Sequence, residues 1–266
     1  MSTRALRTAA SGLYAQQLNV EVISNNIANV NTTGFKKNKA EFQDLMYQEV
    51  AVNPLSTTTP GVNDAASSKI QVGNGVAPSS SLKVFSQGDI TATNNQLDLA
   101  IQGDGFFQLK RTDGTYAYTR DGTFQANAEG KIVNASGYEL DPEITVDQNV
   151  LSVAIGKDGQ ITGNTVGGGS ESLGHLELVR FMNSPGLDAI GNNLYVETPA
   201  SGSPLVGTPG ANGYGEINQG YLESSNVDIV EEMISMITAQ RAYEINSKTV
   251  KTVEDMMTMA NNLKGN

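Results

Sequence analysis

The sequence predicts an α+β protein with long N- and C-terminal helices that form a coiled-coil-like inner domain, and an antiparallel all-β outer domain between them. Apolar residues recur every seven positions at both ends of the chain, as in helices that pack along a narrow seam. Between these ends, short alternating segments are separated by turns that contain glycine, which is typical of antiparallel strands. The expected division is an N-terminal helix at 1–35, an extended linker at 36–70, the β domain at 71–220 and a C-terminal helix at 221–266.

The N-terminal pattern runs from residue 3 to about residue 30. Its seven-residue repeat comprises Leu6, Leu13, Val20 and Ile27. Ala9 and Gln16, three positions further on, are a poor second seam row, and Gly12 costs about 1 kcal/mol relative to Ala in a helix. This helix is therefore expected to be marginal alone. Two ways of stabilising it stay open: packing among several copies of the chain, and a self-sufficient helical hairpin within one chain.

An Asn-rich run ends this helix. Asparagine amides compete for backbone partners and disfavour helix interiors, and glycine readily ends a helix in the left-handed conformation. The residues concerned are Asn25, Asn26, Asn29, Gly34 and Phe35. They form a helix end and a turn, and the amides could also bind the backbone of a neighbouring chain.

The segment that follows changes from helical to loop composition. Residues 52–68 are rich in Thr, Ser, Pro and Gly, which predicts an exposed loop or linker. Val52, Pro54, Pro60 and Ser68 mark its extent.

Residues 70–220 have β character. Turn signals stand at Asp113-Gly114, Asp121-Gly122, Glu129-Gly130 and Asp158-Gly159, and each is flanked by a predicted strand. Strands are expected at 116–119, 131–133, 152–155, 175–181 and 193–197. This spacing favours a barrel-like or sandwich domain.

The C-terminal pattern predicts one long helix from about Tyr221 to Leu263. Asn226 and Asp228 offer oxygens for its N-cap. Its seam repeats at Met236, Tyr243, Val250 and Met257, and a second row follows three positions further on, at Ala239, Asn246, Val253 and Ala260. Such a helix needs an apolar partner, which the N-terminal helix can supply.

Composition excludes several classes of chemistry. The chain has no Cys, so disulfides and zinc–thiolate sites are excluded, and its net charge of −11 argues against nucleic acid as a main partner. Its acid–Gly pairs lack the spacing of a calcium loop, and no nucleophile motif accompanies His175, the single histidine. We therefore expect no catalytic residues, no metal site and no cofactor.

Both ends and the middle of the chain resemble one known family. The run AASGLYAQQLNVEVISNNIANVNTTGFKKNKAEFQDLMYQ is similar to the N-terminal signature of the flagellar rod and hook family. The runs GYLESSNV and ITAQRAYEINSKTVKTVEDMM are similar to its C-terminal signature. LDLAIQGDGFFQL and AYTRDGTF resemble its middle domain. The C-terminal motif includes Gln240, Arg241, Ala242 and Tyr243. The stretch at 52–68 and the chain length are most similar to the distal rod members.

The resemblance implies a structural role in the basal body of the bacterial flagellum. A distal rod subunit would form a rigid helical homopolymer that transmits motor torque to the hook. Implied partners are other copies of the chain, the proximal rod proteins, the hook protein, and the ring proteins of the peptidoglycan and outer membrane. The rod spans the periplasm, and the flagellar type III export apparatus would deliver the chain without a cleaved signal peptide.

Other functions fit the sequence pattern without the resemblance. A proximal rod or hook paralogue of the same family is one alternative. A trimeric adhesin-like protein or a carbohydrate-active β protein with a helical stalk belongs to a different class. Sedimentation at rising concentration discriminates among them, because an open polymer has no fixed final size whereas a trimer has one.

Overall fold

The computed structural model describes residues 2–51, 69–147, 150–165 and 169–264. They belong to two compact units. The helical unit comprises Met1–Asn25, Lys39–Ser81 and Val230–Asn266, and the β unit comprises Asn26–Asn38 and Leu82–Ile229. Each unit is described by itself.

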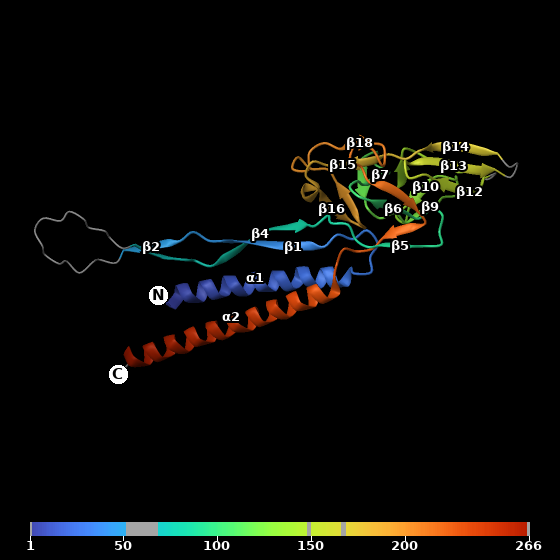
Figure 1. The fold of residues 1–266 in the computed structure, drawn as a ribbon. Coiled ribbons are helices and arrows are strands. Elements are labelled where there is room, and N and C mark those ends of the chain that lie inside the picture. The colour runs from blue at the N-terminus through green and yellow to red at the C-terminus, as the bar shows by residue number, and fades with distance from the viewer. Residues whose placement is uncertain (1, 52–68, 148–149, 166–168, 265–266) are drawn as a thin grey trace, which may run out of the picture. The chain divides into compact units, whose positions relative to one another are not determined.

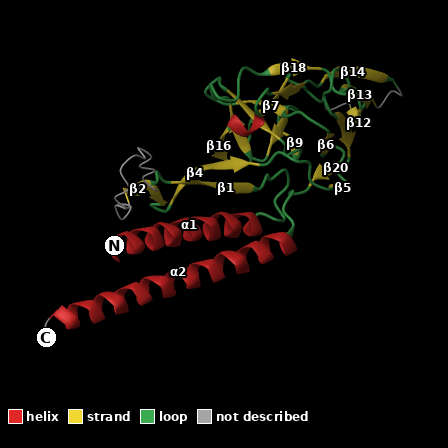
Figure 2. Cartoon of the chain, turned by 60° about the vertical axis from the view of Figure 1, so that its left-hand side comes forward, coloured by secondary structure: helices red, strands yellow, loops and turns green. Residues whose placement is uncertain are grey.

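The helical unit contains α1 (Ser2–Ala28) and α2 (Ile229–Lys264), which lie side by side and antiparallel (Figures 1 and 2). The two helices touch at Gly12, where a Cβ would lie 3.0 Å from Nδ2 of Asn246. Buried apolar side chains in this pair are few and mostly small: Ala9, Ala15, Ile23, Ala239 and Val253. The helices are therefore paired within one chain, with a thin core.

The start of the C-terminal helix differs from the prediction. A helix from Tyr221 is wrong, because Tyr221–Glu223 forms strand β20, which pairs with β5 (Ile90–Ala92), and α2 begins only at Ile229. Asn226, predicted as a cap, instead accepts a hydrogen bond at Oδ1 from the backbone N–H of Lys37, at 2.8 Å. Strand pairing and this long-range bond override the local helical pattern.

The predicted linker forms a two-stranded ribbon in its described part. β1 (Asn38–Asp44) pairs with β4 (Val76–Lys83), and β2 (Gln48–Ala51) pairs with β3 (Lys69–Val72). The ribbon lies beside α1 (Figure 1), where the hydroxyl oxygen of Ser11 accepts a hydrogen bond from the Val76 N–H at 3.2 Å. The stretch 52–68, with Val52, Pro54, Pro60 and Ser68, lies outside the described residues.

The β unit is built from short antiparallel strands. Within the described residues, the largest sheet has the order β16-β17-β8-β7-β11-β10-β9, and β12-β13-β14 form a smaller one. Three strand pairs, β15-β18, β19-β6 and β20-β5, complete it. The remaining bounds are β6 Leu99–Gln102, β7 Phe107–Lys110, β8 Tyr116–Thr119, β9 Phe124–Ala126, β10 Ile132–Asn134, β11 Glu139–Asp141, β12 Val150–Ile155, β13 Gln160–Thr165, β14 Ser170–His175, β15 Leu178–Arg180, β16 Asp188–Gly191, β17 Leu194–Val196, β18 Leu205–Gly207 and β19 Glu216–Gln219, with a short 3-10 helix at Ser184–Gly186.

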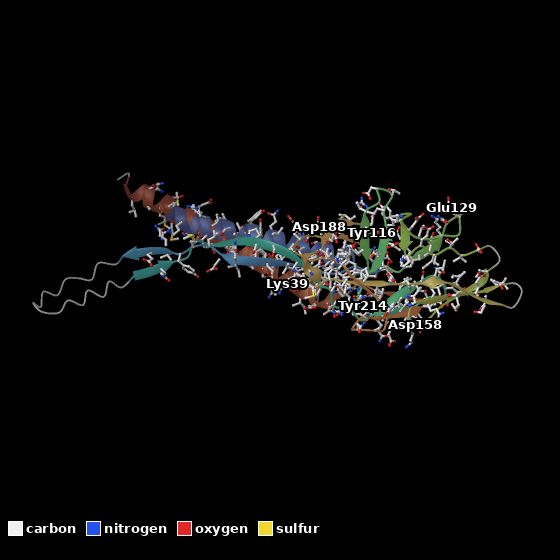
Figure 3. The ribbon with its side chains drawn as sticks, turned by 90° about the horizontal axis from the view of Figure 1, so that it is seen from above. Lys39, Tyr116, Glu129, Asp158, Asp188 and Tyr214 are labelled. Atoms are coloured by element: carbon white, nitrogen blue, oxygen red, sulfur yellow. The ribbon has the colours of Figure 1, made fainter. Side chains whose placement is uncertain are left out.

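The apolar core of the β unit joins these sheets. Alternate residues of β7 (Phe107 and Leu109) pack with residues of β6, β9 and β13 in one cluster of buried side chains, including Ile101, Phe124 and Ile161. A second cluster is aromatic and gathers Phe106, Tyr118, Phe181 and Tyr195. Tyr116, Glu129 and Asp158, which Figure 3 labels, are exposed on the surface of this unit. In β7 the buried Phe107 and Leu109 alternate with more exposed residues, as the sequence predicts, whereas three consecutive residues are buried in β6 and in β8.

Three of the predicted hairpin turns are confirmed. Gly114, Gly130 and Gly159 have positive φ between the paired strands β7–β8, β9–β10 and β12–β13. The hairpin at Asp121-Gly122 is wrong, because β8 and β9 are not partners: β8 pairs with β7 and β17. Gly122 serves close packing instead, since a Cβ there would collide with the carbonyl oxygen of Leu99.

Candidate assembly interface

α2 carries a row of large apolar side chains that face solvent. Ile234 is 58% exposed and Leu263 is 82% exposed. The exposed row comprises Met233, Ile234, Ile237, Ile245, Met256, Met259 and Leu263. Exposed apolar patches of this kind mark interaction surfaces.

The exposed row and the predicted seam lie on opposite faces of α2. At about 100° per residue, the exposed row occupies an arc of about 140°, and its middle is turned by roughly 150° from the middle of the seam. The seam side contains Asn246, which touches Gly12 of α1, and the buried Ala239 and Val253. The seam therefore faces α1 of the same chain, and the exposed row faces away from it.

The predicted seam residues are only partly covered. On α1, Leu6, Leu13, Val20 and Ile27 are half-buried, and so are Met236, Val250 and Met257 on α2, whereas Tyr243 is exposed. Their role as contacts between copies stays a prediction. The seven-residue template missed the exposed row because Arg241 and Lys248 interrupt it midway along the helix. A search for apolar residues spaced at i, i+4 and i+7 outside the seam would have found the two ends of this row.

The C-terminal motif surrounds the middle of α2. Gln240 and Arg241 are exposed, Ala242 is half-buried and Tyr243 is exposed. Arg241, Glu244 and Lys248 fall within the arc of the exposed row, so this face has apolar ends and a charged centre.

Four of the N-terminal motif residues, Asn26, Asn29, Gly34 and Phe35, lie at a junction inside the β unit, whereas Asn25 belongs to the helical unit. Asn26 is buried and exchanges two 2.9 Å hydrogen bonds with the backbone of Asn38: its Nδ2 donates to the carbonyl and its Oδ1 accepts from the N–H. Gly34 has a φ of +67° and donates its N–H to the carbonyl of Glu223 at 2.8 Å. Phe35 is buried, whereas Asn25 is exposed and Asn29 half-buried. The bonds of Asn26 lie within one chain.

A buried ion cluster holds this junction together. Lys36 Nζ lies 2.6 Å from Glu223 Oε1, and both side chains are inaccessible to solvent. Lys36 also donates to the carbonyl of Ser86 at 2.7 Å, and Nη1 of the buried Arg120 lies 3.7 Å from Glu223 Oε2. Burial lowers the pKa of Lys36 and that of Arg120, while the charge of Glu223 opposes both shifts. One carboxylate thus serves two buried cations.

The cluster fixes the segments that adjoin both helices. Residues 29–38 follow α1, and residues 224–228 lead from β20 into α2. Asn226 adds bonds from Nδ2 to the carbonyls of Val84 and Ser86, and Thr33 Oγ1 bonds to Asp121 Oδ1 at 3.1 Å. The sequence analysis missed this cluster, since nothing local indicates that Lys36 and Glu223, far apart in the chain, would meet. The only signal is that each of its charges falls within a segment that resembles the family.

The described residues offer no sign of a metal centre or a membrane-spanning helix. No three or more of their His, Asp and Glu side chains are grouped so as to hold a metal ion. Neither α1 nor α2 combines the length and hydropathy that a bilayer requires.

Comparisons with known proteins match three parts of the chain to flagellar families. Residues 6–36 match the family "Flagella basal body rod protein" and residues 218–263 match "Flagellar basal body rod FlgEFG protein C-terminal". Residues 100–163 match "Flagellar hook protein FlgE/F/G D1 domain". The first two contain the junction segments and α2.

Whole-chain relatives carry the same description. The flagellar basal-body rod protein FlgG of Buchnera aphidicola subsp. Schizaphis graminum is 47% identical, over 95% of this chain and 96% of its own length. The FlgG of Caulobacter vibrioides is 46% identical over 98% of this chain and 99% of its length. The rod protein FlgF of the same organism is 34% identical over 95% of this chain and 94% of its length. The similarity is therefore higher to FlgG than to the FlgF paralogue within one organism.

Proposed function

This chain belongs to the FlgG family of flagellar basal-body rod proteins and is a structural subunit of the distal rod, and we propose that its copies join through the exposed row of α2. Membership of a rod family implies assembly with rod and hook components. An adhesin-like protein or a carbohydrate-active protein would belong to a different family.

The observation that carries the proposal is the two-faced apolar character of α2. One face is used against α1 within the chain, and the other leaves large side chains such as Met259 and Leu263 in water. Each such side chain gains about 1.5–3 kcal/mol when it is fully buried. Contacts between neighbouring copies supply that burial, and a contact that does not close on itself generates a filament.

The predicted division of the chain fits this role. We propose that α1 and α2 form the inner layer of the tube and that the β unit lies outside. The thin core of the helix pair supports a monomer in which these helices are marginal. Burial on assembly would then provide much of the free energy that orders them.

Finer partners follow from the family and belong to the same proposal. The subunit would contact the proximal rod proteins, the hook protein and the peptidoglycan and outer-membrane ring proteins. It would pass through the flagellar type III export apparatus, and its place in the rod would span the periplasm. The stretch 52–68 would pack between neighbours and stiffen the rod. Deleting it should loosen or curve the tube without unfolding the subunit.

Charge placed on the exposed row tests the proposed contact. Ile234→Asp and Ile237→Asp should block tube growth in sedimentation at rising concentration and abolish swimming in a strain that lacks its own copy. Both positions are exposed in the single chain, so the melting temperature of the monomeric variants should equal that of the wild-type monomer. Ser247→Asp is the matched control, because it adds the same charge to an exposed position of the same helix outside the arc. Tube growth by Ile234→Asp at the wild-type concentration would refute this assignment.

Charge on the seam tests the role predicted for the seven-residue repeat. Met236→Asp or Leu13→Asp would bury a carboxylate between the helices and should abolish assembly and motility, with the β unit still folded. Normal swimming by either variant would contradict a buried seam. A cryo-EM image of the purified basal body with a tagged subunit would place the chain along the rod.

A further inference from the structure

The β unit contains a pocket of about 280 Å³ beside the buried ion cluster. This space is far larger than the roughly 10–15 Å³ that one water molecule requires. Its wall combines aromatic rings with charged groups, and the residues used below are Asp104, Phe106, Arg120, Arg180, Phe181 and Met182.

Arg120, which lines the pocket, has unused hydrogen-bonding capacity. The residue is 3% exposed, and its guanidinium stacks on Phe106 at 5.6 Å. Its Nη2 donates to the carbonyl of Gly103 at 2.7 Å, but its Nη1 reaches Ile101 O only at 3.5 Å, and its Nε has no partner among the described residues. A guanidinium has five N–H donors, and leaving such donors unpaired in a buried site is costly.

The charges around the pocket are unbalanced towards the positive. Arg180 lines the same pocket, and its Nη2 lies 3.7 Å from Oδ2 of Asp104. Behind the pocket, Arg120 shares the single carboxylate of Glu223 with Lys36. These ion pairs hold three cations and two anions, in a chain whose net charge is −11. Two guanidinium groups that line one pocket favour a carboxylate, whose two oxygens match their donors.

The edge of the pocket indicates that the carboxylate belongs to a protein. Met182 also lines the pocket and is 86% exposed, which a free small anion would leave uncovered. A side chain from a protein neighbour would bring apolar surface to cover it. The chain itself has 28 acidic residues, and its copies are neighbours in the rod.

We propose that this pocket receives an Asp or Glu side chain of a neighbouring copy of the chain, which completes the hydrogen bonding of Arg120 and forms an ion pair with Arg180. The inference rests on the proposed function, because it requires copies that assemble. It assigns a contact of the β unit, separate from the exposed row of α2.

Two substitutions at the pocket should change assembly in opposite directions. Arg180→Gln removes one charged donor and should raise the concentration needed for tube growth by roughly tenfold or more, the loss expected for a charge-assisted hydrogen bond. Asp104→Asn removes a competing carboxylate that is largely exposed, and should lower that concentration by about two- to fivefold. If the Arg180–Asp104 pair only stabilised the fold, both changes would weaken assembly. Lys157→Gln, which breaks the exposed Lys157–Glu216 pair, is the matched control and should have no effect.

Folding is checked in the same full-length proteins. Arg180 also stacks on Tyr214 at 5.5 Å, so thermal unfolding of Arg180→Gln must be measured beside assembly. If that variant is unstable, Asp104→Asn still decides, because its expected gain in assembly cannot come from a damaged fold.

Two further arms distinguish a neighbouring copy from a free acid. Sodium acetate titrated into the wild-type monomer, followed by NMR of the arginine side chains, reports binding of a free carboxylate. Met182→Ser should weaken tube growth and leave any acetate binding unchanged. Acetate binding together with normal tube growth of Arg180→Gln and Met182→Ser would overturn the proposal.

Failure of the pocket and failure of the proposed function have different signatures. Wild-type tubes with an unchanged Arg180→Gln variant would overturn the pocket contact alone. A wild-type chain that stops at a closed oligomer would overturn the proposed assembly, and the pocket contact with it.

Discussion

Glu223→Gln is the sharpest test of the buried junction. The carboxylate of Glu223 accepts from Lys36 Nζ at 2.6 Å and from the Gly88 N–H at 3.0 Å, and its second oxygen faces Arg120. Glutamine keeps the size and one acceptor oxygen but removes the charge. Lys36 and Arg120 would then be two buried cations without a counter-ion.

The expected cost follows from this geometry. Removing one partner of a buried ion pair costs about 3–5 kcal/mol, because the remaining charge stays buried and uncompensated. For a domain of 150–250 residues, 1 kcal/mol shifts the unfolding midpoint by about 2–4 °C, so a decrease of roughly 6–20 °C is expected. Lys36→Met is the matched comparison. It leaves Glu223 with Arg120 and the Gly88 N–H, and should cost only about 1–3 kcal/mol.

The assay must report the β unit rather than the helices. The chain has no Trp, and its two most buried tyrosines, Tyr118 and Tyr195, lie in the aromatic cluster of this unit. Thermal unfolding of full-length protein followed by near-UV circular dichroism therefore monitors the relevant part. A loss below about 1 kcal/mol for Glu223→Gln, or a larger loss for Lys36→Met, would refute the assignment of one carboxylate to two cations.

Three further perturbations test other parts of the structure. Gly34→Ala should destabilise the β unit more than Gly114→Ala in urea unfolding. Both glycines have positive φ, which costs an alanine about 1–2 kcal/mol, but only at Gly34 would the Cβ also collide with a neighbour, 2.6 Å from the Asp121 N. Equal losses of stability would contradict the tight packing around Gly34. Burial, and secondarily the charge of Glu197, raises the pKa of Tyr118 to about 12, so the unfolded state loses the phenolic proton at lower pH than the folded state. The free energy of unfolding should therefore fall between about pH 10 and pH 12. Tyr118→Phe should make this decrease with pH smaller, and an unchanged decrease would show that Tyr118 does not contribute to it. Gly12→Leu should separate α1 from α2, because a Cβ added at Gly12 would already lie 3.0 Å from Asn246 Nδ2. It should impair tube growth although leucine favours helix, whereas Ala10→Leu on the exposed face of α1 should not impair it. Normal tube growth of Gly12→Leu would place the contact between the helices elsewhere.

The sequence predicted the elements of this fold better than their contacts. Both terminal helices and the strand at Tyr116–Thr119 follow from periodicity, since a helix or strand with one buried face must repeat its apolar residues. The sequence also predicted which face of α2 is buried within the chain, because Ala239 and Val253 occupy seam positions and are buried. The start of α2 did not, because pairing of Tyr221 with Ala92 is a long-range interaction that no local pattern encodes.

The candidate sites depend even more on distant contacts. Lys36 and Glu223 are charged residues in segments whose neighbours indicate only a turn and a strand or helix end. Their burial together results from the fold of the whole β unit. The exposed row of α2 was present in the sequence, but a template for one seam assigns every other apolar residue to solvent. A helix with partners on two faces needs both faces to be examined.

The antiparallel helix pair brings the first turn of α1 and the last turn of α2 to the same end of the helical unit (Figures 1 and 2). In the proposed tube, a bulky fusion at either terminus would therefore obstruct the same layer of helices, and moving a label from one terminus to the other would not relieve the obstruction. Labels for imaging are better inserted at turns of the β unit such as Asp113-Gly114, where a Cβ on the glycine would meet no atom within 4 Å. A fluorescent or epitope label at that turn should leave the proposed contacts between the helices of neighbouring copies undisturbed.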